Sequence, residues 1–162
     1  MEHVVIATYV AGAIGRVAEM HARYYSENWG FGLYFEAKVA SDLSEFLNRF
    51  VPGRDYFKVA LTHGRVHGSL AIDAIKAEEE GAHLRWFITS SALRGTGAGN
   101  RLLQDSIDFC KRQGYPSIYL WTFEGLALAR HLYEKFGFKL VEEHPGDQWG
   151  VRVKEQKFVL PL

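Results

Sequence analysis

The chain has 162 residues, which is enough for one domain of ordinary size and too few for two. It carries 19 basic and 19 acidic residues, and the resulting net charge of zero argues against a protein that binds nucleic acid or an anionic membrane over its whole surface. Hydrophobic residues make up 48% of the chain and charged residues 23%, so the sequence can bury a core and is not typical of a disordered protein.

The cysteine count and the N-terminal sequence bear on the cell compartment. Cys110 is the single cysteine, which excludes an intrachain disulfide and a cysteine-based zinc site. No His, Asp or Glu cluster has the spacing of a metal site, so we predict no metal. The apolar run at residues 4–14 is too short to span a bilayer, and no Lys/Arg-rich segment precedes it as in a signal peptide. These features favour a cytoplasmic protein without a membrane partner.

Hydrophobic periodicity predicts the secondary structure of the N-terminal half. Apolar residues at three- and four-residue steps predict helices over residues 15–28 and 35–50. Branched and aromatic residues predict strands at 4–10, 56–62 and 66–75, and His63-Gly64-Arg65 reads as the tight turn of a hairpin. The acidic segment at residues 78–81 reads as a polar turn.

In the C-terminal half, segments with the periodicity of strands alternate with segments that have the periodicity of helices. We predict strands at residues 83–89, 118–122, 138–142 and 151–159, with helices at 100–113 and 126–136. This element order predicts an α/β (α+β) domain, in which helices cover both faces of a mixed, mostly antiparallel central sheet.

A glycine-rich loop between the strand at 83–89 and the next helix is the most informative stretch. It reads Arg94-Gly95-Thr96-Gly97-Ala98-Gly99. Free N–H groups and the dipole at a helix start favour an anion, and glycines let the backbone approach a phosphate closely. Arg94 and Arg101 would add charge-assisted contacts. The loop lacks the Gly-Lys-Ser/Thr of a P-loop and the spacing of a dinucleotide fingerprint.

The loop pattern Arg-x-x-Gly-x-Gly resembles the acetyl-CoA pyrophosphate motif of the GNAT superfamily of N-acetyltransferases. A second match lies downstream, where residues 129–138 read ARHLYEKFGF and resemble that family's A-x-x-L-Y-x-K-x-G-F segment. The predicted element order also matches, so the resemblance covers nearly the whole chain. It implies a GNAT fold with residues 1–162 as a single acetyltransferase domain.

The resemblance implies transfer of an acetyl group from acetyl-CoA to the primary amine of a small molecule or peptide by direct attack. Tyr133 would be the general acid that protonates the CoA thiolate, although it would also suit a buried core position. The residues implied in cofactor binding are Phe87, Ile88, Thr89, Arg94, Gly95, Thr96, Gly97, Ala98, Gly99, Asn100 and Arg101.

One position departs from the family pattern. Many members have Asn seven residues before the helix tyrosine, and this chain has Leu126. The run from Leu120 to Tyr133 resembles a subgroup often fused to winged helix-turn-helix (MarR-like) regulators, but the chain has no room for such a domain, and we expect no nucleic-acid partner. No general base is evident. Glu124 is the nearest acidic candidate, and it would equally suit a solvated loop.

The loop between the first two helices is rich in aromatics and contains two acids. By the same resemblance it contributes the acceptor pocket, with Tyr25, Glu27, Trp29, Phe31 and Glu36 as candidate substrate-binding residues. These aromatics would equally suit the core or a homodimer interface. The alternative to an enzyme is a non-catalytic acyl-CoA-binding sensor or regulatory module.

Overall fold

The computed structural model describes residues 3–162 and contains a seven-stranded sheet. The strand order is β1-β2-β3-β4-β5-β7-β6, and only the β4–β5 pair is parallel. This confirms the predicted mixed, mostly antiparallel sheet. The strands are β1 (Val5–Ala7), β2 (Tyr56–Thr62), β3 (Arg65–Asp73), β4 (Ala82–Thr89), β5 (Ser117–Phe123), β6 (Lys139–Gly146) and β7 (Val153–Pro161).

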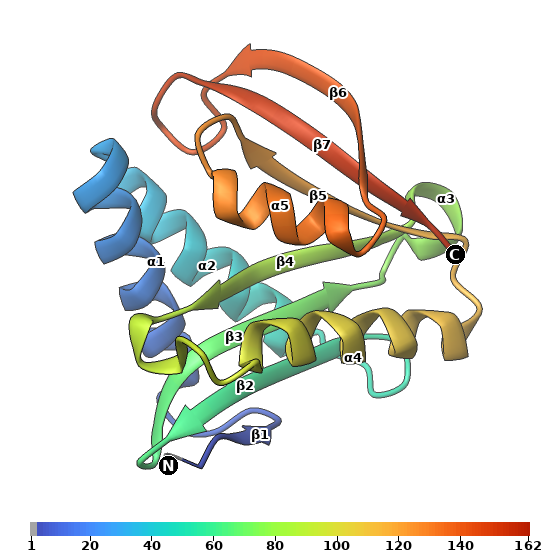
Figure 1. Cartoon of the computed structure of the whole chain (residues 1–162), viewed down its shortest axis with the longest axis horizontal. Coiled ribbons are helices and arrows are strands. Elements are labelled where there is room, and N and C mark those ends of the chain that lie inside the picture. The colour runs from blue at the N-terminus through green and yellow to red at the C-terminus, as the bar shows by residue number, and fades with distance from the viewer. Residues whose placement is uncertain (1–2) are drawn as a thin grey trace.

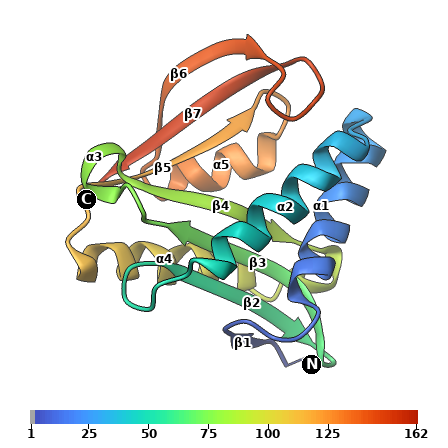
Figure 2. The ribbon, with the colours of Figure 1, turned by 180° about the vertical axis from the view of Figure 1, so that it is seen from behind.

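Two pairs of helices cover the two faces of the sheet, as predicted. Figure 1 shows α4 (Ala98–Gln113) and α5 (Ala127–Lys135) in front of the strands. The view from behind shows α1 (Ala13–Trp29) and α2 (Leu33–Asn48) on the opposite face (Figure 2). A short helix, α3 (Ala77–Glu80), and a 3-10 turn, η1 (Ser91–Leu93), complete the fold. No helix in residues 3–162 is long and apolar enough to cross a membrane.

The apolar faces of the helices form separate cores on the two sides of the sheet. On the α4 side, Leu102, Leu103 and Ile107 pack against buried residues of β3, β4 and β5. On the α1 side, Val17 and Leu43 are fully buried against β2 and β3. Because helical side chains three or four positions apart share a face, this spacing buries one stripe of each helix.

Several predicted boundaries differ from the structure. The first strand spans only Val5–Ala7, because the chain then turns and Gly12, with φ +89°, precedes α1. The polar turn predicted at residues 78–81 is wrong in part, since Ala77–Glu80 forms one helical turn that ends at Gly81. The strand predicted at 138–142 continues to Gly146 as the edge strand β6.

The sheet is interrupted at its centre, between β4 and β5. These strands pair only at Ala82–Ile118 and His83–Tyr119, and then diverge. Beyond the paired residues, β4 contains a bulge in its register with β3, and Trp86 there has a φ of +48°. Ser69 Oγ donates a hydrogen bond of 2.7 Å to the Trp86 carbonyl oxygen and so fixes the bulge. The divergence leaves a gap through the middle of the fold.

Candidate functional site

A cavity of about 210 Å³ lies in the gap between the diverging strands. Its walls come from both faces of the sheet, because α1 and α2 contribute to one side and α5 to the other. Residues from both faces of the sheet therefore meet around one cavity. The side chains that line it include His21, Tyr25, Phe35, Lys38, Asp42, His83, Arg85, Phe87, Phe123, Leu126, Tyr133, Gln148 and Trp149.

The glycine-rich loop leads from the end of β4 into α4. Thr96 Oγ1 donates a hydrogen bond to the Leu93 carbonyl and accepts one from the Ala98 N–H. Gly97, at φ +78°, then begins the helix in a left-handed conformation that favours glycine. Within residues 3–162, the N–H groups of Gly99 and Asn100 donate to no other group. The first turn of α4 thus presents free donors, which suit an anion such as a pyrophosphate.

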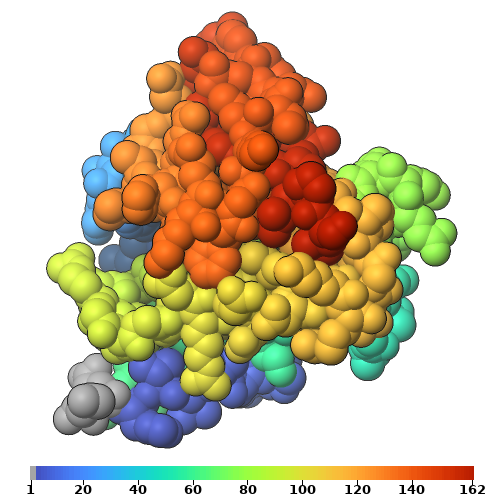
Figure 3. Space-filling model, turned by 45° about the vertical axis from the view of Figure 1, so that its right-hand side comes forward, coloured from blue at the N-terminus to red at the C-terminus, as the bar shows by residue number. Residues whose placement is uncertain are grey.

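The surroundings of this loop are exposed and positively charged. In the space-filling view, the yellow-green loop stands out at the edge of the molecule below the orange surface of α5 (Figure 3). Arg94 and Arg101 are exposed, and Arg101 is 3.9 Å from Asp105. Lys135 of α5 donates to Asn100 Oδ1 over 3.4 Å, so a third cation lies beside the helix start. Gly95, Thr96 and Gly97 are exposed along the same surface.

Phe87, Ile88 and Thr89 form the C-terminal end of β4, beyond its last pair with β5. Phe87 lines the cavity, and Ile88 and Thr89 pair with β3 on their other side. The edge of β4 that faces β5 is therefore open to an extended ligand. Such an edge offers backbone donors and acceptors to the ligand in the way that a neighbouring strand does.

Tyr133 lies on α5 at the wall of the cavity. Its ring contacts Phe87, Phe138 and Phe158, and the residue is only 7% exposed. Burial raises the pKa of the Tyr133 phenol above its usual value of 10, so the hydroxyl is protonated at neutral pH. Leu126, which replaces the family's common Asn, lines the same wall and offers no polar atom there.

Aromatic side chains from α1, α2 and β5 form the opposite wall. Tyr25 lines the cavity, and its ring lies 5.2 to 5.8 Å from those of Trp29, Phe31, Phe35 and Phe123. Phe31 is 2% exposed and belongs to the core behind Tyr25. Glu27 and Glu36 are exposed and do not line the cavity. Their assignment to the acceptor, like the homodimer, stays a prediction.

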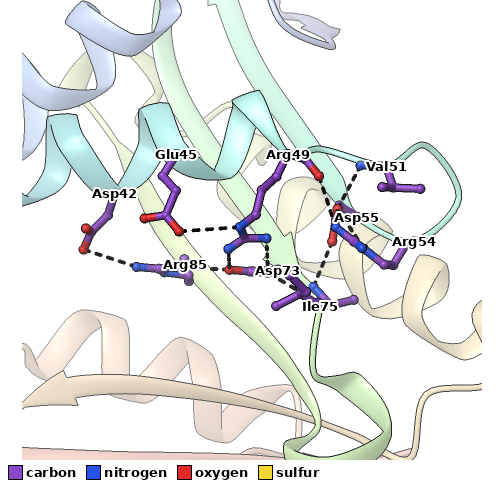
Figure 4. A network of polar contacts seen from close by, with 10 residues as sticks. Asp42, Glu45, Arg49, Val51, Arg54, Asp55, Asp73, Ile75 and Arg85 are labelled. Carbon is purple, nitrogen blue, oxygen red and sulfur yellow. Dashed lines mark hydrogen bonds and ion pairs between the residues drawn. The ribbon is translucent and has the colours of Figure 1, made fainter.

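Charged residues that the sequence analysis missed lie at the α2 side of the cavity. Asp42 accepts from Lys38 over 3.2 Å and lies 3.5 Å from Arg85. Figure 4 shows how a network fixes this group, because buried Asp73 of β3 binds both Arg85 of β4 and Arg49, the residue that follows α2. The Arg49 guanidinium lowers the pKa of the Asp73 carboxyl, although burial opposes it.

Two histidines that were not among the predicted site residues, His21 and His83, also line the cavity. His21 of α1 is 6% exposed, and burial lowers its pKa to about 4. His83 of β4 stacks on Tyr119 with 4.4 Å between ring centres, and burial lowers its pKa to about 3. Both imidazoles are therefore neutral at physiological pH. His21 lies four residues after buried Val17, and this helical spacing indicates that it faces the same buried side of α1.

The loop between β6 and β7 closes one end of the cavity. Both oxygens of buried Glu155 accept hydrogen bonds from Gln148, at 2.9 Å from its backbone N–H and 2.8 Å from its side chain. Trp149 follows and packs on Phe123 with 5.6 Å between ring centres. Glu124 is exposed and does not line the cavity, so its assignment as the base stays a prediction.

Comparison with known proteins supports the resemblance seen in the sequence. The model of the acetyltransferase (GNAT) family matches residues 14–138. An uncharacterized N-acetyltransferase of Schizosaccharomyces pombe is 27% identical over 127 residues, which are 78% of this chain and 77% of that protein. The resemblance to the subgroup fused to DNA-binding regulators is not supported by these matches and stays a prediction.

Solved structures share the fold at low sequence identity. A GNAT acetyltransferase of Staphylococcus aureus Mu50 superposes with a TM-score of 0.77 at 17% identity, covering 99% of both chains. The structure of yncA of Salmonella typhimurium, which contains its cofactor acetyl-CoA, gives a TM-score of 0.71 at 15% identity over 98% of this chain and 94% of that one. The predicted fold is thereby confirmed. The chain belongs to the GNAT family of acetyltransferases, and acetyl-CoA is its cosubstrate.

Proposed function

We propose that this protein is an N-acetyltransferase that transfers the acetyl group of acetyl-CoA to the primary amine of a small molecule or peptide. The observation that carries the proposal is the cavity that passes through the sheet between β4 and β5, with the Tyr133 side chain on its wall. The free N–H groups at the start of α4 lie on one side of the sheet and the aromatic wall with Tyr25 on the other. We include in the proposal that residues 1–162 act as one acetyltransferase domain.

The loop side binds the cosubstrate. The donors of Gly99 and Asn100, with Arg94 and Arg101 beside them, would hold the pyrophosphate. The open edge of β4 at Phe87–Thr89 would hold the pantetheine arm by backbone hydrogen bonds. The side chain of Leu126 leaves that arm without the amide contact that many family members provide.

Acetyl-CoA supplies the thioester carbonyl carbon that the amine attacks. The departing sulfur carries negative charge as the carbon–sulfur bond breaks, so a proton donor beside it accelerates the reaction. Tyr133 suits this role because its hydroxyl stays protonated and because no hydrogen bond within residues 3–162 engages it. Among these residues the Tyr133 hydroxyl oxygen has no hydrogen-bond partner, and it is still not fully buried. It is therefore accessible from the cavity that Tyr133 lines.

The acceptor enters from the α1–α2 side. Tyr25, Phe35 and Phe123 form an apolar wall for the body of the amine, and Lys38 with Asp42 forms a polar rim. The volume of about 210 Å³ suits a small amine or the terminal residue of a peptide rather than a large rigid molecule. Trp29 and Phe31 support this wall from behind Tyr25.

The direct test is acetyl-CoA turnover with a panel of primary amines. The panel would include arylalkylamines, amino acids, polyamines and short peptides with a free N-terminus, with thiol release and product mass as readouts. We expect N-acetylated product from at least one class of amine. Tight binding of acetyl-CoA without acetylation of any amine would contradict an enzyme and support the alternative, a non-catalytic acyl-CoA-binding sensor.

A further inference from the structure

We propose that His21 is the residue that accepts the proton of the acceptor amine. The inference rests on the proposed function and names the base that the sequence did not reveal. The ring of His21 makes a hydrogen bond that fixes its tautomer, and its other nitrogen is accessible from the cavity. The other candidate bases are bound to neighbouring residues or lie outside the cavity.

The hydrogen bond of His21 fixes its tautomer. Nδ1 lies 2.8 Å from the carbonyl oxygen of Val17, one helical turn earlier in α1. A carbonyl oxygen can only accept, so Nδ1 carries the proton and donates it. In the neutral ring, Nε2 is then the unprotonated nitrogen, with its lone pair directed away from the helix backbone. Such an arrangement orients a histidine base in many enzymes.

Nε2 of His21 opens onto the cavity. Within residues 3–162, Thr62 Oγ1 is the one buried side-chain nitrogen or oxygen that lacks a hydrogen-bond partner. No described group bonds to Nε2 of His21, and His21 lines the cavity, so this nitrogen is accessible there. The ring also stacks on Tyr25, with 6.2 Å between centres and planes 18° apart, which holds its plane against the aromatic wall.

The other candidate bases are engaged or outside the cavity. Asp42 is paired with both Lys38 and Arg85. His83 stacks on Tyr119 at the point where β4 and β5 still pair, and no described hydrogen bond fixes its tautomer. Glu124 is exposed and lies outside the lining. His21 is thus the cavity residue whose free lone pair has a fixed direction.

The proton balance of the transfer closes with two side chains. The C–N bond forms and the C–S bond breaks. One proton passes from the amine nitrogen to Nε2 of His21, and one passes from the Tyr133 hydroxyl to the sulfur. A proton then returns from the imidazolium to the tyrosinate, directly or through water, and both side chains regain their starting states. The acceptor must arrive as a neutral amine, because a free ammonium is far too weak an acid for this base.

The surroundings of His21 keep its imidazole unprotonated at neutral pH, and they also make it a weaker base than a free histidine. Burial lowers its pKa to about 4, and the bond to Val17 only partly offsets this shift. His21 is therefore unprotonated at pH 7, and it faces the amine nitrogen when bond formation has made that nitrogen acidic. The titratable and charged groups that share its cavity are Tyr25, Lys38, Asp42, His83, Arg85 and Tyr133.

The first test requires no turnover. Nitrogen-15 NMR of the whole protein, with and without bound CoA, reports the tautomer of His21. We expect a protonated Nδ1, a bare Nε2 and no titration of this ring between pH 5 and 8. The opposite tautomer, or a titration near pH 6.5, would overturn the proposal.

The second test uses kinetics with an amine that the panel identifies as a substrate. His21→Gln leaves an amide near the Nε2 position, and an amide does not act as a base at neutral pH. His21→Asn keeps a hydrogen-bond donor for the Val17 carbonyl and leaves no atom at the Nε2 position. We expect kcat to fall about 100-fold in both variants, with KM for the amine within threefold of wild type. The wild-type kcat should stay level down to pH 5, since His21 is unprotonated throughout that range.

Acetyl-CoA affinity and thermal unfolding distinguish this role from a structural one. Both variants should bind acetyl-CoA as wild type does. His131→Gln, at an exposed position of α5, is the control and should leave kcat, acetyl-CoA affinity and thermal unfolding unchanged. A folded variant with wild-type kcat, or with only KM raised, would refute a role in proton transfer. Failure of the wild type itself to acetylate any amine would instead refute the proposed function.

Discussion

The two ends of the cavity differ in how they are built. At the proposed cosubstrate end, one continuous segment from β4 into α4 presents backbone N–H groups and exposed cations. At the proposed acceptor end, α1, α2, β4, β5 and the β6–β7 loop each contribute buried or half-buried side chains. A backbone site of this kind depends on local conformation, whereas the acceptor site depends on contacts between distant segments. Substitutions should therefore act through conformation at the first end and through side-chain chemistry at the second.

The largest effect is expected at Gly97. Gly97→Val places a branched side chain at φ +78° beside the free donors of α4, so acetyl-CoA affinity should fall more than 100-fold. Isothermal titration calorimetry measures this loss. Gly114→Val is the matched control, because Gly114 ends the same helix at φ +76°. It should lower stability similarly without changing affinity, and equal affinity losses in both variants would contradict a phosphate site at Gly97.

Between the two ends, on the α5 wall of the cavity, Tyr133→Phe removes one oxygen and leaves the aromatic packing in place. We expect kcat to fall about 100-fold, because the thiolate loses its proton donor, while the dissociation constant of acetyl-CoA stays within twofold. Steady-state kinetics and calorimetry on the same preparation give both values. Unchanged turnover would show that Tyr133 is only a core aromatic.

The buried histidine predicts a pH effect that the exposed end should not show. The pKa of His21 is about 4 in the folded protein against about 6.5 when unfolded, so the unfolded chain binds the proton first as the pH falls. Its contribution to stability is complete above pH 6.5 and decreases by about 2 kcal/mol by pH 5. Urea unfolding at pH 7 and pH 5 should show a smaller loss in His21→Gln than in wild type. The same loss in both proteins would mean that His21 titrates normally.

The smallest effect is expected at Glu155, which holds the β6–β7 loop against the cavity. Glu155→Gln replaces one acceptor oxygen by a donor and so removes one of the two hydrogen bonds from Gln148. KM for the amine should rise about fivefold, with kcat and acetyl-CoA affinity unchanged. Glu143→Gln on neighbouring β6 is the control, since Glu143 binds Lys154 and Gln156 away from the cavity. A change in acetyl-CoA affinity at Glu155 would show that the loop serves both ends.

Much of the structure of the glycine-rich loop could be predicted because its signals are local. The strand, the glycines and the helix that follow one another at residues 83–113 define the loop without knowledge of any other segment. The structure starts α4 at Ala98 and leaves the first-turn donors free. Hydrophobic periodicity likewise gave β2 its observed bounds, since Tyr56–Thr62 lies in a hairpin whose turn is evident in the sequence.

The acceptor end could not be predicted in the same way. The predicted acidic residues of this site are Glu27 and Glu36 of the aromatic loop, whereas the structure places Lys38 and Asp42 on the cavity. These two follow Phe35 at helical spacing, but only the packing of α2 over β4 shows which of its faces meets Arg85. The bulge at Trp86 has no local signature either, because a non-glycine residue at positive φ is held there by Ser69 of another strand.

The short pairing between β4 and β5 also affects the mechanics of the molecule. Two residue pairs, Ala82–Ile118 and His83–Tyr119, join the β1–β4 part of the sheet to the β5–β7–β6 part. In the proposed binding mode, a cosubstrate arm on the open edge of β4 would supply some of the hydrogen bonds that β5 does not. Binding of the ligand that brings the acetyl group would then also stabilise the folded chain, since it joins the two parts of the sheet.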